Sequence, residues 1–173
     1  MKFKIKKFFL LLIVFFSISS LSSTEDYVLI PENILDIRSG SLIDGNIQIK
    51  DGIIIAINKK LSNDKDKNIV LKGITLIPGL MDAHVHLIGN NELNGYESIS
   101  ESSQMATIYG VKNAKNTLLA GFTTVRNVGA GHFADVALRD AIKDEVVIGP
   151  RMIVSGPTLS ISGGHGDNNL LPF

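Results

Sequence analysis

The chain has 173 residues, of which 45% are hydrophobic, so it is long enough to form a domain with a sizeable core. Its 17 basic and 17 acidic residues give a formal net charge of zero, which offers no support for a nucleic-acid or acidic partner. The absence of cysteine excludes disulfides and thiolate chemistry, so any metal ion must be held by histidine, carboxylate or a modified side chain.

The first 22 residues have the three-part pattern of a secretory signal peptide. Four lysines among the first seven residues precede an unbroken apolar run at 8–16, and small polar residues follow. A membrane-spanning helix is the alternative, but it needs about 20 apolar residues and this run is shorter. We therefore expect a signal peptide over residues 1–22, cleaved near Ser22, and a periplasmic or secreted protein. Membrane contact is expected only through this export.

Residues 27–77 are typical of a small all-β module, in which short apolar runs alternate with turn residues. The strongest local signal is Asp51-Gly52, which separates the strand-like runs 46–50 and 53–57. Glycine readily adopts the positive φ that a tight two-residue turn requires, so the sequence predicts a β-hairpin at this point.

The remainder of the module is expected to contain three more extended segments. The first covers residues 27–37 and is expected to be interrupted at Pro31, because proline has no N–H to donate. Two short strands are expected at 69–71 and 74–77, separated by a turn at Gly73.

Residues 77–87 (IPGLMDAHVHL) carry the strongest chemical signal of the chain. They read as a short strand entered through a Pro-Gly turn. Side chains alternate across a strand, so Asp82, His84 and His86 share one face, opposite an apolar face suited to packing against helices. At a rise of ~3.3 Å per residue the two imidazoles are roughly 7 Å apart along the strand, and they can converge on one divalent ion.

Two interpretations of these histidines compete. They are either core side chains satisfied by hydrogen bonds or ligands of a metal ion. Two imidazoles and a carboxylate on one buried face are costly without partners, which favours metal binding by His84 and His86. Asp82 lies deeper along the strand, and we favour a carboxylate that supports the ligands over a ligand itself.

Beyond His86 the hydrophobic period changes to that of helices. Ser98 and Glu101 have the spacing of a capping box, and Gly121 stands where a glycine after a helix end is expected. Between them, apolar residues recur at helical spacing. These residues are Ile108, Val111, Ala114 and Leu118.

Two strand-like runs, 122–128 and 151–155, enclose a second predicted helix. Its apolar stripe contains Ala134, Ala137, Leu138, Ala141 and Ile142, and we place Asp135, Arg139, Asp140 and Lys143 outside the stripe. The order β-α-β-α-β predicts an α/β fold of parallel strands with crossover helices. A (β/α)8 barrel needs eight such strands and an open doubly wound sheet usually has five or more, so we expect the chain to hold part of a domain.

These motifs together resemble the amidohydrolase superfamily. The strand at 77–87 is similar to the first barrel strand of that family, the all-β module resembles its N-terminal β-sandwich segment, and 120–127 (AGFTTVRN) resembles its second strand. Residues 149–151 (GPR) through 163–167 (GGHGD) most resemble the branch with imidazolonepropionase-like and Xaa-Pro dipeptidase-like enzymes. The resemblance covers about residues 27–170.

The resemblance implies a β-sandwich segment at 23–77 and, at 78–173, about the first three strands of a TIM-like metal-dependent hydrolase barrel. The site would hold one or two divalent ions, most commonly Zn2+, and His84 and His86 would be ligands of one of them. Family members complete this centre with a lysine, two histidines and an aspartate on later strands, positions that this chain does not contain. Asn127 stands where many relatives carry aspartate.

Two further histidines fall in loops that follow strands, where barrel active sites are built. His165 lies in a glycine-rich loop, and contact with a substrate carboxylate and a plain surface position remain equally open. For His132 we favour a solvent-exposed turn residue over one that lines the mouth of the site. Residues 129–131 (GAG) lack the full dinucleotide fingerprint, so we reject a phosphate cradle.

The reaction implied for the intact protein is hydrolysis of an amide or peptide-type C–N bond, as in a dipeptidase, with a small molecule or dipeptide as substrate. A deaminase of the same superfamily is a neighbouring alternative. A second hypothesis is a catalytically incompetent fragment, because ligands on later strands are missing. No nucleic-acid partner is expected, and a homo-oligomer is compatible with the sequence.

Overall fold

A computed structural model describes residues 26–58, 67–164 and 166–167. The predicted signal peptide and His165 lie outside these residues. The chain divides into two units, with the boundary between Leu76 and Ile77. Each unit has its own sheet and its own buried residues, so each is described by itself.

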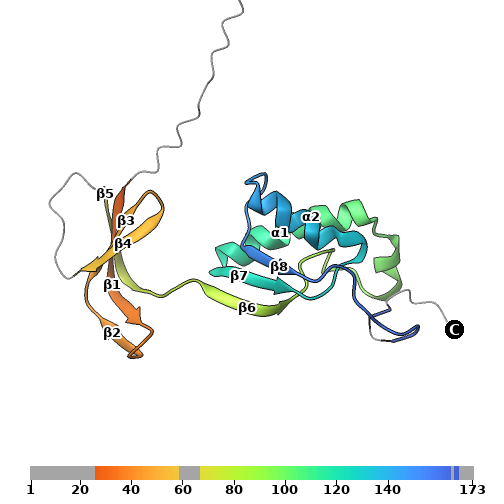
Figure 1. The fold of residues 1–173 in the computed structure, drawn as a ribbon, viewed down its shortest axis with the longest axis horizontal. Helices are drawn as coiled ribbons and strands as arrows, with labels where there is room; N and C mark the ends of the chain where they lie inside the picture. The colour runs from red at the N-terminus through yellow and green to blue at the C-terminus, as the bar shows by residue number, and fades with distance from the viewer. Residues whose placement is uncertain (1–25, 59–66, 165, 168–173) are drawn as a thin grey trace, which may run out of the picture. The chain divides into compact units, whose positions relative to one another are not determined.

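One five-stranded sheet makes up the described part of the first unit (Figure 1). Its strands are β1 (Tyr27–Asp36), β2 (Ser41–Ile43), β3 (Asn46–Lys50), β4 (Ile53–Asn58) and β5 (Lys67–Leu76). β1 is central, because it pairs antiparallel with β2 and β3 and parallel with β5. The buried side chains Val28, Ile34 and Ile47 come from β1 and β3.

The predicted hairpin between β3 and β4 is confirmed. The two strands pair antiparallel, and Asp51 and Gly52 both have positive φ, at 51° and 74°. These values suit a type I′ turn, whose twist matches that of the flanking strands.

Two other strand predictions in this unit are wrong. β1 continues through Pro31, and β5 is one strand that includes Gly73. The parallel pairing of β1 with β5 shifts register between Pro31 and Asn33, so an irregularity in the ladder accommodates the proline. The expected β-sandwich segment corresponds, in the described residues, to a single sheet.

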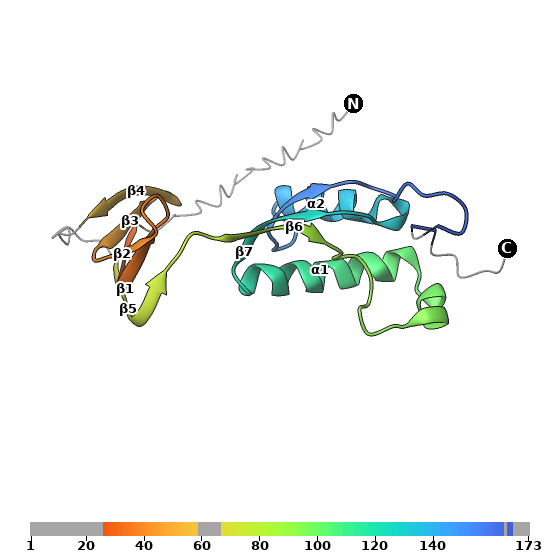
Figure 2. The same ribbon diagram turned by 90° about the horizontal axis from the view of Figure 1, so that it is seen from below.

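The second unit is built on three parallel strands in the order β6-β7-β8 (Figure 1 and Figure 2). Their bounds are β6 (Leu80–Val85), β7 (Phe122–Asn127) and β8 (Arg151–Val154). Both adjacent pairs are parallel, which confirms the predicted β-α-β-α-β arrangement. The described residues form an open three-stranded sheet and not a closed barrel.

The helices of this unit are η1 (Gly95–Ser100), α1 (Ser103–Leu119), η2 (Gly131–Phe133) and α2 (Ala134–Lys143). The expected capping box is misplaced, because Ser102 caps α1 by accepting from the N–H of Met105. Gly121 follows the end of α1 with a φ of 98°, as predicted. Within the described residues, no helix is long and apolar enough to cross a membrane.

The core of the second unit lies between the sheet and its two helices. It consists of Leu87, Ala114, Val125, Leu138 and Met152, which come from both helices and from all three strands or the residues after them. On β6 only the end of the apolar face joins this core, since Val85 packs against it but Met81 is 77% exposed. The expectation that this whole face packs on helices is therefore wrong, because α1 and α2 pack beside β7 and β8.

Candidate functional site

His84 and His86 lie side by side at the end of β6. Their ring centroids are 5.4 Å apart and the ring planes meet at 69°. Val85 and Leu87, which alternate with them, are part of or packed against the core. The end of the strand therefore anchors Val85 and Leu87 in the protein and presents both imidazoles on the opposite face, as the alternation in the sequence predicts.

Both imidazoles line a cleft with a volume of about 1030 Å³. The walls come from segments that follow the three parallel strands: the loop after β6, residues 128–132 after β7, and residues 157–158 and 166–167 after β8. The site thus lies at the carboxyl ends of the strands, where the loops of parallel α/β folds gather functional groups.

The carboxylate of Asp82 acts on the backbone of the strand. Its Oδ1 accepts a hydrogen bond of 2.9 Å from the main-chain N–H of His84. From the neighbouring strand, Nε of Arg126 donates to the carbonyl oxygen of Ala83 at 2.7 Å. The single peptide group between Ala83 and His84 is therefore bound at its N–H by an acidic side chain and at its C=O by a basic one.

The donor set fits part of a metal centre. Two imidazoles on one face are suitable ligands for a divalent ion, and a catalytic zinc usually has three protein ligands and one open position. In the part of the chain that the structure describes, no group of three or more His, Cys, Asp or Glu could hold a metal ion. The described residues can therefore supply two ligands of such a centre.

His132 also lines the cleft, on the wall formed after β7. Its side chain is exposed, and both His132 and Phe133 have left-handed backbones, with φ of 55° and 57°. Two consecutive non-glycine residues in this region carry conformational strain, which the surrounding turn must hold in place. His132 is thus both an exposed turn residue and part of the cleft.

Sequence reasoning missed two polar residues behind the site. Asn127, at the end of β7, and Asp135, in the first turn of α2, are both fully buried. The placement of Asp135 on the outside of its helix is therefore wrong. This carboxylate accepts from the N–H of Gly156 at 3.0 Å, from that of Val136 at 2.9 Å, and from Nδ2 of Asn127 at 3.4 Å.

Asn127 connects this carboxylate to the histidine strand. Its Oδ1 accepts a hydrogen bond of 2.8 Å from the N–H of Leu87, the residue directly after His86. Its Nδ2 donates to the carbonyl oxygen of Gly129 at 3.2 Å as well as to Asp135. In the sequence, this role is signalled by a polar residue near the end of a predicted strand, two positions before a glycine and at a position where many members of the resembled family carry aspartate.

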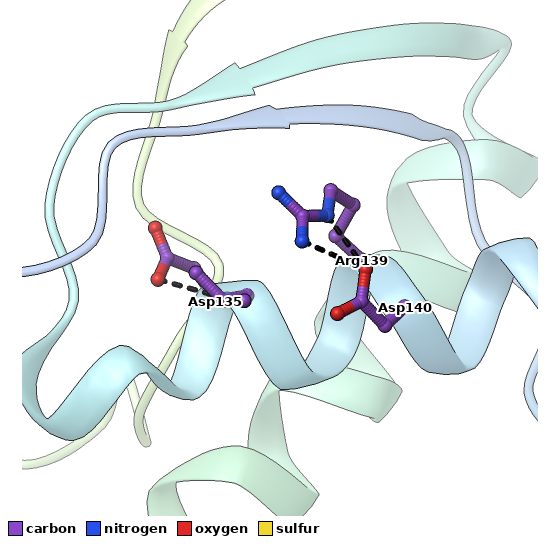
Figure 3. A network of polar contacts seen from close by, with 4 residues as sticks. Asp135, Arg139 and Asp140 are labelled. Carbon is purple, nitrogen blue, oxygen red and sulfur yellow. Dashed lines mark hydrogen bonds and ion pairs between the residues drawn. The ribbon is translucent and has the colours of Figure 1, made fainter.

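Other charged groups of α2 behave as the sequence predicts. Arg139 and Asp140 form an exposed ion pair, with N···O 2.8 Å, further along the helix that carries Asp135 (Figure 3). The hydrogen bond from Arg139 lowers the pKa of Asp140, and the same bond raises the pKa of Arg139. Neither residue lines the cleft.

Comparisons with known proteins agree on one family. The model of the amidohydrolase family matches residues 75–171. A solved Xaa-Pro dipeptidase with bound methionine in the active site superposes with a TM-score of 0.72 at 33% identity, covering 83% of this chain and 36% of that one. A prolidase complexed with N-methylphosphonate-L-proline gives a TM-score of 0.70 at 31% identity, covering 82% of this chain and 34% of that one.

A curated relative gives a similar result. Ochratoxinase of Aspergillus niger is 36% identical over 101 residues, which are 56% of this chain and 20% of that protein. The chain thus spans about a third of the length of the two solved structures and a fifth of this relative.

Proposed function

Because the chain belongs to the amidohydrolase family, we propose that His84 and His86 are metal ligands of a hydrolase that cleaves an amide or peptide-type C–N bond. The observation that carries this proposal is the pair of imidazoles, 5.4 Å apart, on the cleft side of β6. Zinc is the expected ion, in one or two copies, because a cluster of histidines suits divalent zinc.

When bound, such an ion lowers the pKa of a coordinated water to about 7 and polarises the scissile carbonyl. The described residues of this chain would position the metal ligands. Asp82 holds the N–H of His84, which fixes the backbone from which that imidazole projects. The general acid/base and the other ligands are expected outside this segment.

For the substrate we propose a dipeptide or a small amide. The cleft volume of about 1030 Å³ is ample for a molecule of that size. The similarity to an Xaa-Pro dipeptidase and a prolidase, each above 30% identity, supports a dipeptidase-like substrate.

The test uses the full-length protein and its His84→Ala/His86→Ala variant. We expect the purified wild type to contain zinc and to hydrolyse Xaa-Pro dipeptides, and the variant to lose both metal and turnover. A wild-type protein with neither bound metal nor turnover would overturn the proposal. Release of ammonia without peptide cleavage would instead assign a deaminase.

A second candidate function is that these 173 residues alone are a catalytically incompetent part of such an enzyme. The short length of this chain relative to its solved relatives supports it. These residues span 36% of the solved dipeptidase, and the described residues supply only two ligands. We expect this polypeptide by itself to aggregate or to remain partly unfolded, and to lack hydrolase activity. A cooperative melt with zinc-dependent turnover of the isolated segment would contradict this.

We further propose that the protein is exported, with residues 1–22 as the signal peptide. The proposal is supported by the lysines and the apolar run that the sequence places there. Its partners would be the small-molecule or dipeptide substrate and, where it oligomerises, further copies of itself. Cell fractionation of the tagged protein, together with N-terminal sequencing, tests the export.

A further inference from the structure

Leu87, the residue that follows His86, is bound by an asparagine side chain at its N–H and by another at its C=O. Oδ1 of Asn127 accepts from the N–H of Leu87 at 2.8 Å. On the other side, Nδ2 of Asn113 donates to the carbonyl oxygen of Leu87 at 2.8 Å and to that of Gly89 at 3.0 Å. Side chains from β7 and α1 therefore form hydrogen bonds to the same residue, Leu87, which is only 6% exposed. We call this pair of contacts the asparagine clamp.

The asparagine clamp restricts the backbone from which the His86 imidazole projects. The N–H of Leu87 belongs to the peptide group that begins at the carbonyl of His86, so its direction depends on the ψ angle of His86. The bond from Asn127 fixes the peptide group that follows His86, and the bond from Asn113 fixes the next peptide group along the chain. Together they restrict the backbone beside His86, while its imidazole lines the cleft. A ligand held in this way has less entropy to lose when a metal binds.

The amide of Asn127 is in turn oriented by its own neighbours. Its Nδ2 meets two acceptors, the carbonyl oxygen of Gly129 and Oδ2 of Asp135, so only Oδ1 can face the donor at Leu87. Asn127 and Asp135 are both fully buried, where an unpaired donor or acceptor costs the most. The carboxylate thus selects the orientation of the amide that reaches the histidine strand.

We propose that Asn127 and Asn113 are positioning residues for His86, and that Asp135 acts through Asn127. The chain of contacts runs from α2 through the end of β7 to the peptide beside the ligand. This inference rests on the proposed function, since the asparagine clamp can position a metal ligand only if His86 binds a metal ion. None of these three residues is proposed to touch the metal or the substrate.

The test compares zinc affinities in the full-length protein, measured by competition with a chromophoric chelator. Asn127→Leu and Asn113→Leu keep the side-chain size approximately but remove the hydrogen bonds to Leu87. Each should weaken zinc binding about 10- to 100-fold, the usual range for groups that orient metal ligands. Asp135→Leu should weaken it less, and Asn127→Leu/Asp135→Leu no more than Asn127→Leu alone, because Asp135 acts through the amide.

The matched control is Val125→Ala. Val125 lies on the same face of β7 as Asn127 and is buried in the core, but it makes no hydrogen bond to Leu87. It should destabilise the protein and leave the zinc affinity within about two-fold of wild type. If Asn127→Leu and Val125→Ala change zinc affinity to the same extent, Asn127 is merely structural and the proposal is wrong.

A second readout does not depend on metal. Hydrogen exchange at the amide of Leu87 should accelerate in Asn127→Leu beyond the change in global stability, and it should follow global stability in Val125→Ala. If the exchange rate of the Leu87 amide is unchanged in Asn127→Leu, the asparagine clamp does not restrict this part of the backbone and the proposal is wrong. If exchange accelerates as expected but the wild type binds no zinc, the proposed function fails and the positioning role toward a ligand fails with it. If wild-type zinc binding survives Asn127→Leu unchanged, only this inference fails.

Discussion

Nδ2 of Asn127 donates a hydrogen bond to Oδ2 of Asp135 at 3.4 Å, and neither side chain has any exposed surface. The same carboxylate oxygen accepts from the N–H of Gly156, the second residue after β8. The first turn of α2 is therefore joined to the ends of two parallel strands. These are the strand ends from which two walls of the cleft begin.

This connection predicts a large difference between two aspartates of one helix. Asp135→Ala leaves the N–H of Gly156 and one N–H of Asn127 without their acceptor in a buried site, so it should lower the free energy of unfolding by about 2–3 kcal/mol. Asp140→Ala removes an exposed ion pair and should change the free energy of unfolding far less. Urea denaturation of the two variants tests this, and equal effects would show that the buried network contributes nothing.

Gly79 is required by close packing before β6. The sequence suggests a Pro-Gly turn, but Gly79 has no positive φ, and a Cβ added to it would lie 2.8 Å from Cβ of Thr123 and closer still to the end of that side chain. Gly79→Ala should therefore destabilise the protein by about 1–3 kcal/mol, and Thr123→Ala should restore part of the loss.

Gly131→Ala is the control for this substitution, because no atom lies within 4 Å of the added Cβ and the backbone φ is not positive. It should change the free energy of unfolding by less than about 0.5 kcal/mol. Thermal or chemical denaturation of the three variants provides the measurement. A Gly79→Ala protein as stable as Gly131→Ala would show that the strand shifts to make room without cost.

Local patterns in the sequence predicted much of the fold. Asp51-Gly52 specifies its hairpin because the turn needs positive φ at both positions. Gly121 marks the end of α1 for the same kind of reason. The predictions fail where tertiary pairing decides: β5 continues through Gly73 because β1 pairs with it along its length, and this depends on residues about 40 positions earlier in the chain.

The site was predictable to the extent that its residues follow strand alternation. His84 and His86 lie on one face because the period of a strand is two, and the structure brings their rings together. Asp135 was not predictable in this way, since a charged residue beside an apolar stripe normally faces solvent. Its burial comes from partners on other elements, Asn127 and Gly156, and a helical pattern contains no information about them.

The β1–β2 turn of the first unit provides a prediction about acidity. Oγ of Ser39 donates to Oδ2 of Asp36 at 2.6 Å, and with the N–H of Arg38 it holds the pKa of this carboxyl below its ordinary value. Ser39→Ala should raise the pKa of Asp36 toward that value, as followed by NMR titration. Because the folded-state pKa is depressed, the interaction stabilises the unit above the ordinary pKa of the carboxyl and is lost as the pH falls through the folded-state value.

Ser41→Ala is the matched control for this titration. Only the main-chain N–H of Ser41 takes part, as a donor to Oγ of Ser39, so the substitution leaves the contacts of Asp36 in place. The pKa of Asp36 should remain at its wild-type value in this variant. An equal rise in the two variants would mean that the turn, and not the Ser39 hydroxyl, sets the acidity.

Zinc should stabilise the full-length protein through His84 and His86. An ion that binds only the folded state, at a free concentration of 100 times its Kd, adds about 2.7 kcal/mol to the free energy of unfolding. The Tm should therefore rise when zinc is added and return to its starting value when a chelator is added. His84→Ala/His86→Ala should show neither change. His132→Ala is the control, because His132 lines the same cleft from the wall after β7 and is not proposed as a ligand. A Tm shift that disappears in His132→Ala and survives in the double variant would place the ion at His132 and contradict the assignment of the β6 histidines.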